Sequence, residues 1–188
     1  MADANTHDEV AALRRIIEIT GLLNSTLDLD DLLHTIMTSA AELLDAETSS
    51  LLLVDEESGD LNFTTATGES GQKIERRQVP AHKGIAGWVV DNGEATIIDS
   101  PKDDSRFFEV MDQAIKFETR NMVAVPLRVR GETIGVVEVI NKSDGSFSES
   151  DRDLAQALAN QAAIAIDNAR LYAKLADAVV ASRMSYRL

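Results

Sequence analysis

Apolar residues recur at helical spacing near both ends of the chain. Residues 28–44 carry a broad apolar stripe, and Asp28 stands where a helix N-cap is expected. Residues 9–23 show the same spacing more weakly, and the chain from about residue 149 onward is rich in helix-compatible Ala, Leu, Gln, Ile and Arg. The pattern predicts two helices before the middle of the chain and one long helix after it.

The middle of the chain changes to the pattern of strands and turns. Residues 49–68 predict a hairpin with Gly59 in its turn, and residues 121–142 predict a second hairpin that turns at residues 130–132. Pro126 inside the second hairpin indicates an edge, a bulge or an unpaired position. Because hairpins dominate, we expect an α+β fold in which helices pack on an antiparallel sheet.

Shorter elements are expected between the two hairpins. Residues 84–93 form a glycine-flanked apolar segment long enough for two helical turns, and residues 95–99 predict a short strand. A loop and another short helix are expected over residues 100–120, whereas the polar stretch 69–78 is interpreted as a linker.

Composition limits the classes of function. The net charge of −14 disfavours binding to nucleic acid or anionic membranes, and no apolar run is long enough to span a bilayer. The N-terminus lacks the pattern of a secretion signal, so we expect a cytoplasmic protein, of bacterial type. The absence of Cys removes disulfides, thiolate metal sites and thiol nucleophiles.

The segment NKSDGSFSESD, residues 141–151, joins the last predicted strand to the last helix. Ser148 and Asp151 have the spacing of a capping box, with Asp in place of the preferred Glu. Lys142 can pair with Asp151, and Phe147 can fill a gap beneath the turn. The spacing is explained by helix capping alone, and a further effect on a nearby pocket is left open.

Four segments in this order resemble a GAF domain: TSSLLLVDEESGDL, KGIAGWVVDNGEATIID, TRNMVAVPLRVRGETIGVVEVINK and GSFSESDRDL. The resemblance covers roughly residues 28–172 and is strongest to the regulatory GAF domains of cyclic-nucleotide phosphodiesterases and some bacterial adenylyl cyclases. It implies a PAS-like fold: about six antiparallel strands, the terminal helices on one face, and a lid over a ligand pocket on the other.

The resemblance also implies functional positions. The phosphodiesterase-type motif is matched by Asn141, Lys142, Phe147 and Asp151, although Arg152 stands where Glu is expected next. In this reading the motif supports the pocket without touching the ligand. The ligand contacts implied by the resemblance are Ser50, Ile85, Ala86, Thr119 and Glu138.

One departure bears on the ligand. The nucleotide-binding GAF domains have an aromatic residue and an Asp at the end of the second strand, where this chain has Ala66 and Thr67. The expected ligand is therefore a small polar molecule, with a cyclic nucleotide as one candidate. No cofactor is required and no metal site is expected. The lone loop residue His82, the one candidate for haem ligation near the lid, is more often structural or solvated.

The resemblance thus implies a non-enzymatic signalling sensor. The expected parts are an N-terminal helical segment (residues 1–27), the GAF domain (28–172) and a C-terminal helical extension (173–188). Binding would be signalled through the terminal helices of a homodimer to an unknown partner. The alternative is a ligand-free interaction and dimerisation module, with the pocket filled by Trp88, Phe107, Phe108 and Met122.

Overall fold

A computed structural model describes residues 28–74 and 77–185. It has one six-stranded antiparallel sheet with the strand order β3-β2-β1-β6-β5-β4. The strands are β1 (Ala46–Val54), β2 (Leu61–Ala66), β3 (Gln78–Val79), β4 (Thr96–Ile98), β5 (Met122–Val129) and β6 (Glu132–Lys142). The α+β architecture predicted from the hairpins is confirmed, whereas the helix expected over residues 9–23 lies outside the described residues.

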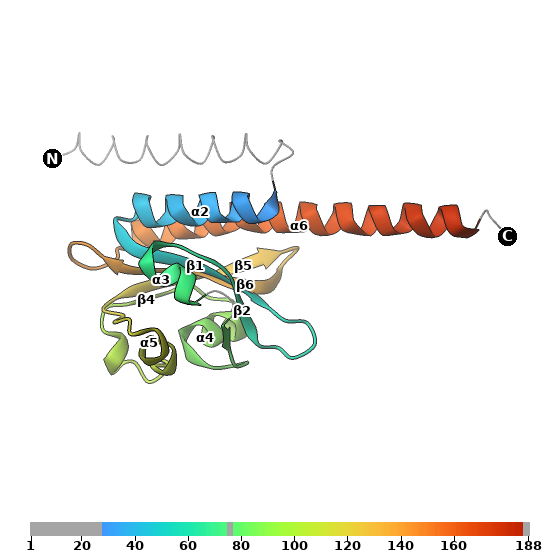
Figure 1. Cartoon of the computed structure of the whole chain (residues 1–188). Helices are drawn as coiled ribbons and strands as arrows, with labels where there is room; N and C mark the ends of the chain where they lie inside the picture. The colour runs from blue at the N-terminus through green and yellow to red at the C-terminus, as the bar shows by residue number, and fades with distance from the viewer. Residues whose placement is uncertain (1–27, 75–76, 186–188) are drawn as a thin grey trace, which may run out of the picture.

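Two helices cover one face of the sheet. α2 (Leu29–Leu43) and α6 (Glu149–Ser185) lie side by side along it, and the C-terminal part of α6 extends beyond the sheet (Figure 1). Asp28 caps α2 as predicted, because its carboxylate accepts a 3.0 Å hydrogen bond from the backbone N–H of Asp30. α6 continues past residue 172 without interruption, so the proposed boundary there is not marked by a break in the helix.

The opposite face carries the short elements. These are α3 (Gly68–Ile74), α4 (Gly84–Asn92), the 3₁₀ turn η1 (Pro101–Asp103) and α5 (Val110–Ile115). α4 and α5 lie below the sheet in Figure 1, opposite α2 and α6. The lid expected over the second face is therefore present. Within the parts of the chain that the structure describes, no helix is long and apolar enough to cross a membrane.

Both faces of the central strands are buried, which explains their nearly continuous apolar sequence. On β6, Val137 and Val139 face α2 and α6, while Val136 joins the core beneath the lid. Glu138 lies between these valines and, by the alternation of side chains along a strand, shares the lid face with Val136. The sheet thus separates a helix-side core from a lid-side core.

The second hairpin has the predicted turn. Arg130 and Gly131 both have positive φ, 53° and 84°, as a tight hairpin turn requires. Pro126 lies beyond the short pairing of β5 with β4, which ends at Ala124, and next to a register shift at Leu127 and Arg128. The edge or bulge predicted from Pro126 is confirmed.

The polar linker predicted over residues 69–78 is wrong at its N-terminal end. Residues 68–74 form α3, which contacts β1, β2 and α5. Two glycines allow this close packing: Gly68 has a φ of +74°, and a Cβ on Gly71 would lie 2.6 Å from the carbonyl oxygen of Ala66. The lid consequently includes α3 as well as residues 80–120.

Candidate functional site

A pocket lies between the sheet and the lid. Its floor comes from β1, β2, β5 and β6, and its walls come from α3, α4, α5 and the segments around them. All five residues that the resemblance assigned to the ligand line this one pocket: Ser50, Ile85, Ala86, Thr119 and Glu138. The structure therefore brings the predicted residues together, and their contact with a ligand stays a prediction.

The strand register builds the polar floor of the pocket. Ser50 of β1 is the pairing partner of Ala66 on β2 and of Glu138 on β6. Glu138 in turn pairs with Ala124 of β5. Side chains of paired residues share a face, so one row of neighbours places a hydroxyl and a carboxylate side by side between two small residues. Ala66 lines the pocket beside this pair, whereas Ala124 belongs to the lid-side core.

Glu138 is the most deeply buried acid in the pocket, with 8% of its surface exposed. Burial raises the pKa of Glu138 to about 7, and the negative charge of Asp112 adds to the shift. A hydrogen bond from the Ser50 hydroxyl opposes the shift, because it favours the ionised carboxylate. Near neutral pH the carboxyl group is therefore close to the midpoint of its titration.

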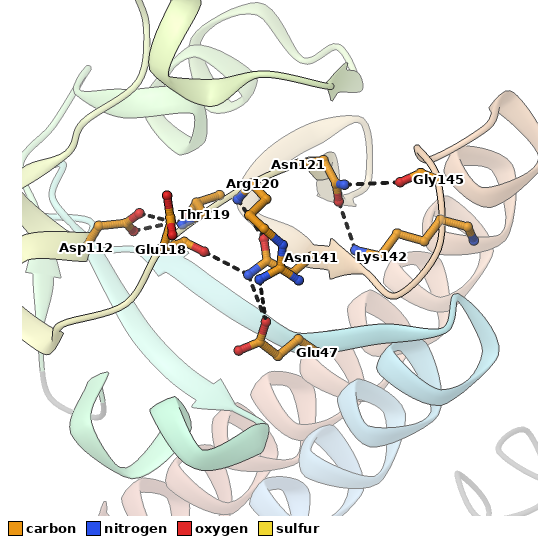
Figure 2. A network of polar contacts seen from close by, with 9 residues as sticks. All are labelled: Glu47, Asp112, Glu118, Thr119, Arg120, Asn121, Asn141, Lys142 and Gly145. Carbon is orange, nitrogen blue, oxygen red and sulfur yellow. Dashed lines mark hydrogen bonds and ion pairs between the residues drawn. The ribbon is translucent and has the colours of Figure 1, made fainter.

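Asp112 of α5 is a pocket residue that the sequence analysis missed. Its carboxylate accepts hydrogen bonds from the Thr119 backbone N–H at 2.8 Å and from the Thr119 hydroxyl at 2.9 Å (Figure 2). Burial raises the pKa of Asp112, and these two hydrogen bonds partly oppose the rise. Nothing in the sequence around Asp112 distinguishes it from the exposed acids, because its partner is brought close by the return of the chain from α5 to β5.

Asn141 organises the connection that carries Thr119. Its amide donates to the Glu118 carbonyl at 2.8 Å and to the Glu47 carboxylate at 2.9 Å, and it accepts from the Arg120 N–H at 2.7 Å (Figure 2). Asn141 is 1% exposed and has a φ of +62°, a backbone conformation that Asn tolerates better than most residues. These bonds hold the residues on both sides of Thr119 in place.

The capping motif predicted between β6 and α6 is present. The Asp151 carboxylate accepts from the Ser148 N–H at 2.8 Å, and the Asp151 N–H donates to the Ser148 hydroxyl at 3.1 Å, which completes a capping box. The Lys142 ammonium lies 3.1 Å from Asp151 and 5.5 Å from the centre of the buried Phe147 ring. It also donates to the Leu44 carbonyl at the C-terminal end of α2, at 3.0 Å.

Four phenylalanines give the pocket an aromatic wall: Phe63, Phe107, Phe108 and Phe117. Met122 also lines it, so three of the four residues suggested to fill the pocket are at its surface. Trp88 is not among the described lining residues and instead packs with the Arg106 guanidinium 4.5 Å above its ring. Trp88 therefore joins α4 to the loop before α5.

The first turn of α4 adds the positive end of a helix dipole. Ile85 and Ala86 are buried and line the pocket, and the N-cap residue Lys83 makes no side-chain capping bond. Backbone N–H groups at such a turn can bind an anionic or electron-rich ligand group. The neighbouring His82 is exposed and bonds Asp91 at 2.8 Å. Within the described residues no cluster of three or more His, Asp or Glu is placed to hold a metal ion.

Comparison with known proteins gives the family. The model of the family described as GAF domain matches residues 28–166. A probable 3',5'-cyclic phosphodiesterase pde-5 from Caenorhabditis elegans is 29% identical over 97% of this chain and 26% of its own length. A dual 3',5'-cyclic-AMP and -GMP phosphodiesterase 11A from Takifugu rubripes is 31% identical over 84% of this chain and 19% of its own length.

A solved structure has the same fold. The GAF domain of a phosphoenolpyruvate-protein phosphotransferase from Coxiella burnetii superimposes with a TM-score of 0.77, at 19% identity, over 87% of this chain and 96% of that one. The chain spans about a quarter or less of the phosphodiesterases that it matches. Since the family model covers most of the chain, this protein belongs to the GAF domain family.

Proposed function

We propose that this chain is a regulatory sensor that binds a small molecule between the sheet and the lid. The observation that carries the proposal is that all five residues that the resemblance assigned to the ligand line the same pocket. Concave, mostly apolar pockets with a few convergent polar groups are the usual form of small-molecule sites. The proposed role is non-catalytic and cytoplasmic, and the ligand acts by changing the structure of the domain.

The signal would pass through the terminal helices of a dimer. The Asn141 side chain bonds the connection that carries Thr119, and the next residue, Lys142, bonds the end of α2 and the start of α6. A ligand that binds two lid positions with different affinity shifts the balance between them by that difference. A shift at Thr119 would then change how α2 and α6 are held, which supports these helices as the output.

Native mass spectrometry on freshly purified protein, followed by a thermal-shift screen, tests the sensor. A retained mass, or an increase of several degrees in the melting temperature with one compound, is expected. Cyclic AMP and cyclic GMP are in the screen because the two relatives are phosphodiesterases of cyclic nucleotides by name. Indifference to every compound, without any retained mass, would shift support to the alternative.

The alternative is an interaction and dimerisation module without a ligand. The observation that favours it is that Phe107, Phe108 and Met122 line the pocket. The module shares with the sensor the exposed apolar residues on α6: Ile164, Leu171, Tyr172 and Leu175. An exposed apolar stripe on a long helix is typical of a helix that packs against another chain. Deletion of residues 173–188 should give a folded monomer by light scattering if the terminal helices form the dimer. A truncated protein that is still dimeric would place the interface elsewhere.

A further inference from the structure

The polar side chains that line the pocket offer mainly hydrogen-bond acceptors to a ligand. Five described residues with polar side chains line it: Thr48, Ser50, Asp112, Thr119 and Glu138. Two of the hydroxyls donate their protons to other groups, Thr48 to the Thr67 carbonyl at 2.6 Å and Thr119 to Asp112 at 2.9 Å. A hydroxyl that already donates has only its lone pairs left for a ligand.

The same holds for the pair at the centre of the floor. Hydrogen bonding from the Ser50 hydroxyl lowers the pKa of Glu138, which is the effect of a donor to the ionised carboxylate, and in that form the Ser50 oxygen is left as an acceptor. A carboxylate has about four acceptor positions, and one hydroxyl uses one of them. In its ionised form Glu138 therefore keeps acceptor capacity towards the cavity that it lines. A ligand that donates several hydrogen bonds would use this capacity.

The charges around the pocket also favour a ligand that donates hydrogen bonds. Two carboxyl groups, Glu138 and Asp112, line the pocket, and no Lys, Arg or His is among its described lining residues. The first turn of α4 offers about half a unit of positive charge, less than the two acids can carry. A buried carboxylate is stabilised by a cationic partner, whereas an anion placed beside it is repelled.

The rest of the wall fits an apolar body with a cationic end. Phe63, Phe107, Phe108 and Phe117 supply ring faces and edges, to which a cation and an aromatic ring are both attracted. We propose that the pocket takes an organic cation, an amine or amidine on an aromatic or branched apolar body, with its charged group on Glu138 and Asp112. The inference rests on the proposed sensor function and names the ligand class for the same pocket.

The titration of Glu138 predicts how binding changes with pH. Asp112 on α5 is the other titratable group among the described residues that line the pocket. A cation binds the ionised form of Glu138, whose pKa is about 7 in the empty protein. Binding of an amine should therefore strengthen by about tenfold from pH 6 to pH 8, since the amine stays protonated over this range. A neutral ligand that accepts a hydrogen bond from protonated Glu138 would instead bind more weakly as the pH rises.

The test uses three probes of matched shape: 2-phenylethylamine, 2-phenylethanol and 3-phenylpropionate. Saturation-transfer NMR titrations on the whole chain, at pH 6 and pH 8, measure each affinity. We expect the amine to bind at least about tenfold more tightly than the other two at pH 8. Glu138→Gln should lose about tenfold in amine affinity. Glu132→Gln, an exposed acid on the same strand, should match the wild type.

Three results would overturn the inference. One is a neutral, carboxylate or cyclic-nucleotide probe that binds as tightly as the amine, and in that case the sensor function stands while the cationic ligand class falls. Another is amine binding that Glu138→Gln leaves unchanged. The third is an amine that does not bind at all. If every compound of the thermal-shift screen also fails to bind and native mass spectrometry finds no retained mass, the proposed sensor function loses its support as well.

Discussion

Asn141 and Lys142 are consecutive residues whose side chains bond different layers of the molecule. The Asn141 amide bonds the lid connection at Glu118 and Arg120, on the way to the pocket residue Thr119 (Figure 2). The Lys142 ammonium bonds the Leu44 carbonyl and the Asp151 carboxylate, at the facing ends of α2 and α6. Two adjacent residues at the end of β6 thus connect the pocket to the terminal helices.

Asp151→Ala should lower the free energy of unfolding by about 1 to 2 kcal/mol, because it removes the capping box and the partner of Lys142. If the motif supports the pocket, the affinity for the compound identified in the screen should fall by more than this loss explains. Urea denaturation and a binding titration measure the two effects. Asp153→Ala, an exposed acid in the same helical turn, is the control. Equally small effects on both quantities would leave Asp151 as a helix cap alone.

Two substitutions separate the contribution of the Asn141 side chain to stability from the contribution of its backbone conformation. Asn141→Gly removes the hydrogen bonds of the side chain, but glycine adopts a φ of +62° without strain. Asn141→Ala removes the same hydrogen bonds and also strains the backbone. We expect Asn141→Ala to be less stable than Asn141→Gly by about 1 kcal/mol. Both variants should be less stable than the wild type in chemical denaturation. Equal stability of the two variants would show that the left-handed backbone contributes nothing.

Glu138 should make the wild type lose stability as the pH rises. A carboxyl group with a raised pKa in the folded state holds its proton more tightly there than in the unfolded chain. Stability therefore falls between the ordinary Glu pKa of 4.5 and the folded value of about 7, and is constant above it. Glu138→Gln removes this loss. The free energy of unfolding of the variant, relative to that of the wild type, should therefore increase from pH 5 to pH 8 by at most roughly 3 kcal/mol.

Chemical denaturation at several pH values measures that gain. Burial raises the pKa of Asp112 in the wild type, and Glu138→Gln keeps that carboxyl group, so the difference between the two proteins reports mainly on Glu138. Glu132→Gln should follow the wild type, because Glu132 is exposed at the start of the same strand. A difference between Glu138→Gln and the wild type that does not change with pH would contradict the raised pKa.

Leu175 offers a test of the dimer that leaves the helix intact. It is 62% exposed and belongs to α6, whose C-terminal part extends beyond the sheet (Figure 1). Leu175→Gln keeps a good helix former while removing apolar surface, so it should weaken self-association at least about tenfold if this stripe is the interface. Light scattering over a dilution series measures the effect. Lys174→Gln is the matched control, and equal association of both variants would exclude Leu175 from the interface.

Local patterns in the sequence determined most of the fold. Alternating apolar residues, the glycine at the hairpin turn and the capping residues Asp28 and Ser148 each act over a few positions, so they can be recognised in the sequence alone. The same patterns predicted α4 and the short helix before β5. The position of five pocket residues came from resemblance, since nothing local distinguishes Ser50 or Glu138 from other strand residues.

The tertiary structure decided what depends on contacts between distant segments. α3 has a polar sequence, and it forms where Gly68 and Gly71 allow it to lie against β1 and β2. Asp112 became a pocket residue because the chain returns from α5 to bring Thr119 to its carboxylate. The bond between Asn141 and Glu47 joins residues 94 positions apart. Such contacts follow from strand register and chain return, which short-range patterns in the sequence do not encode.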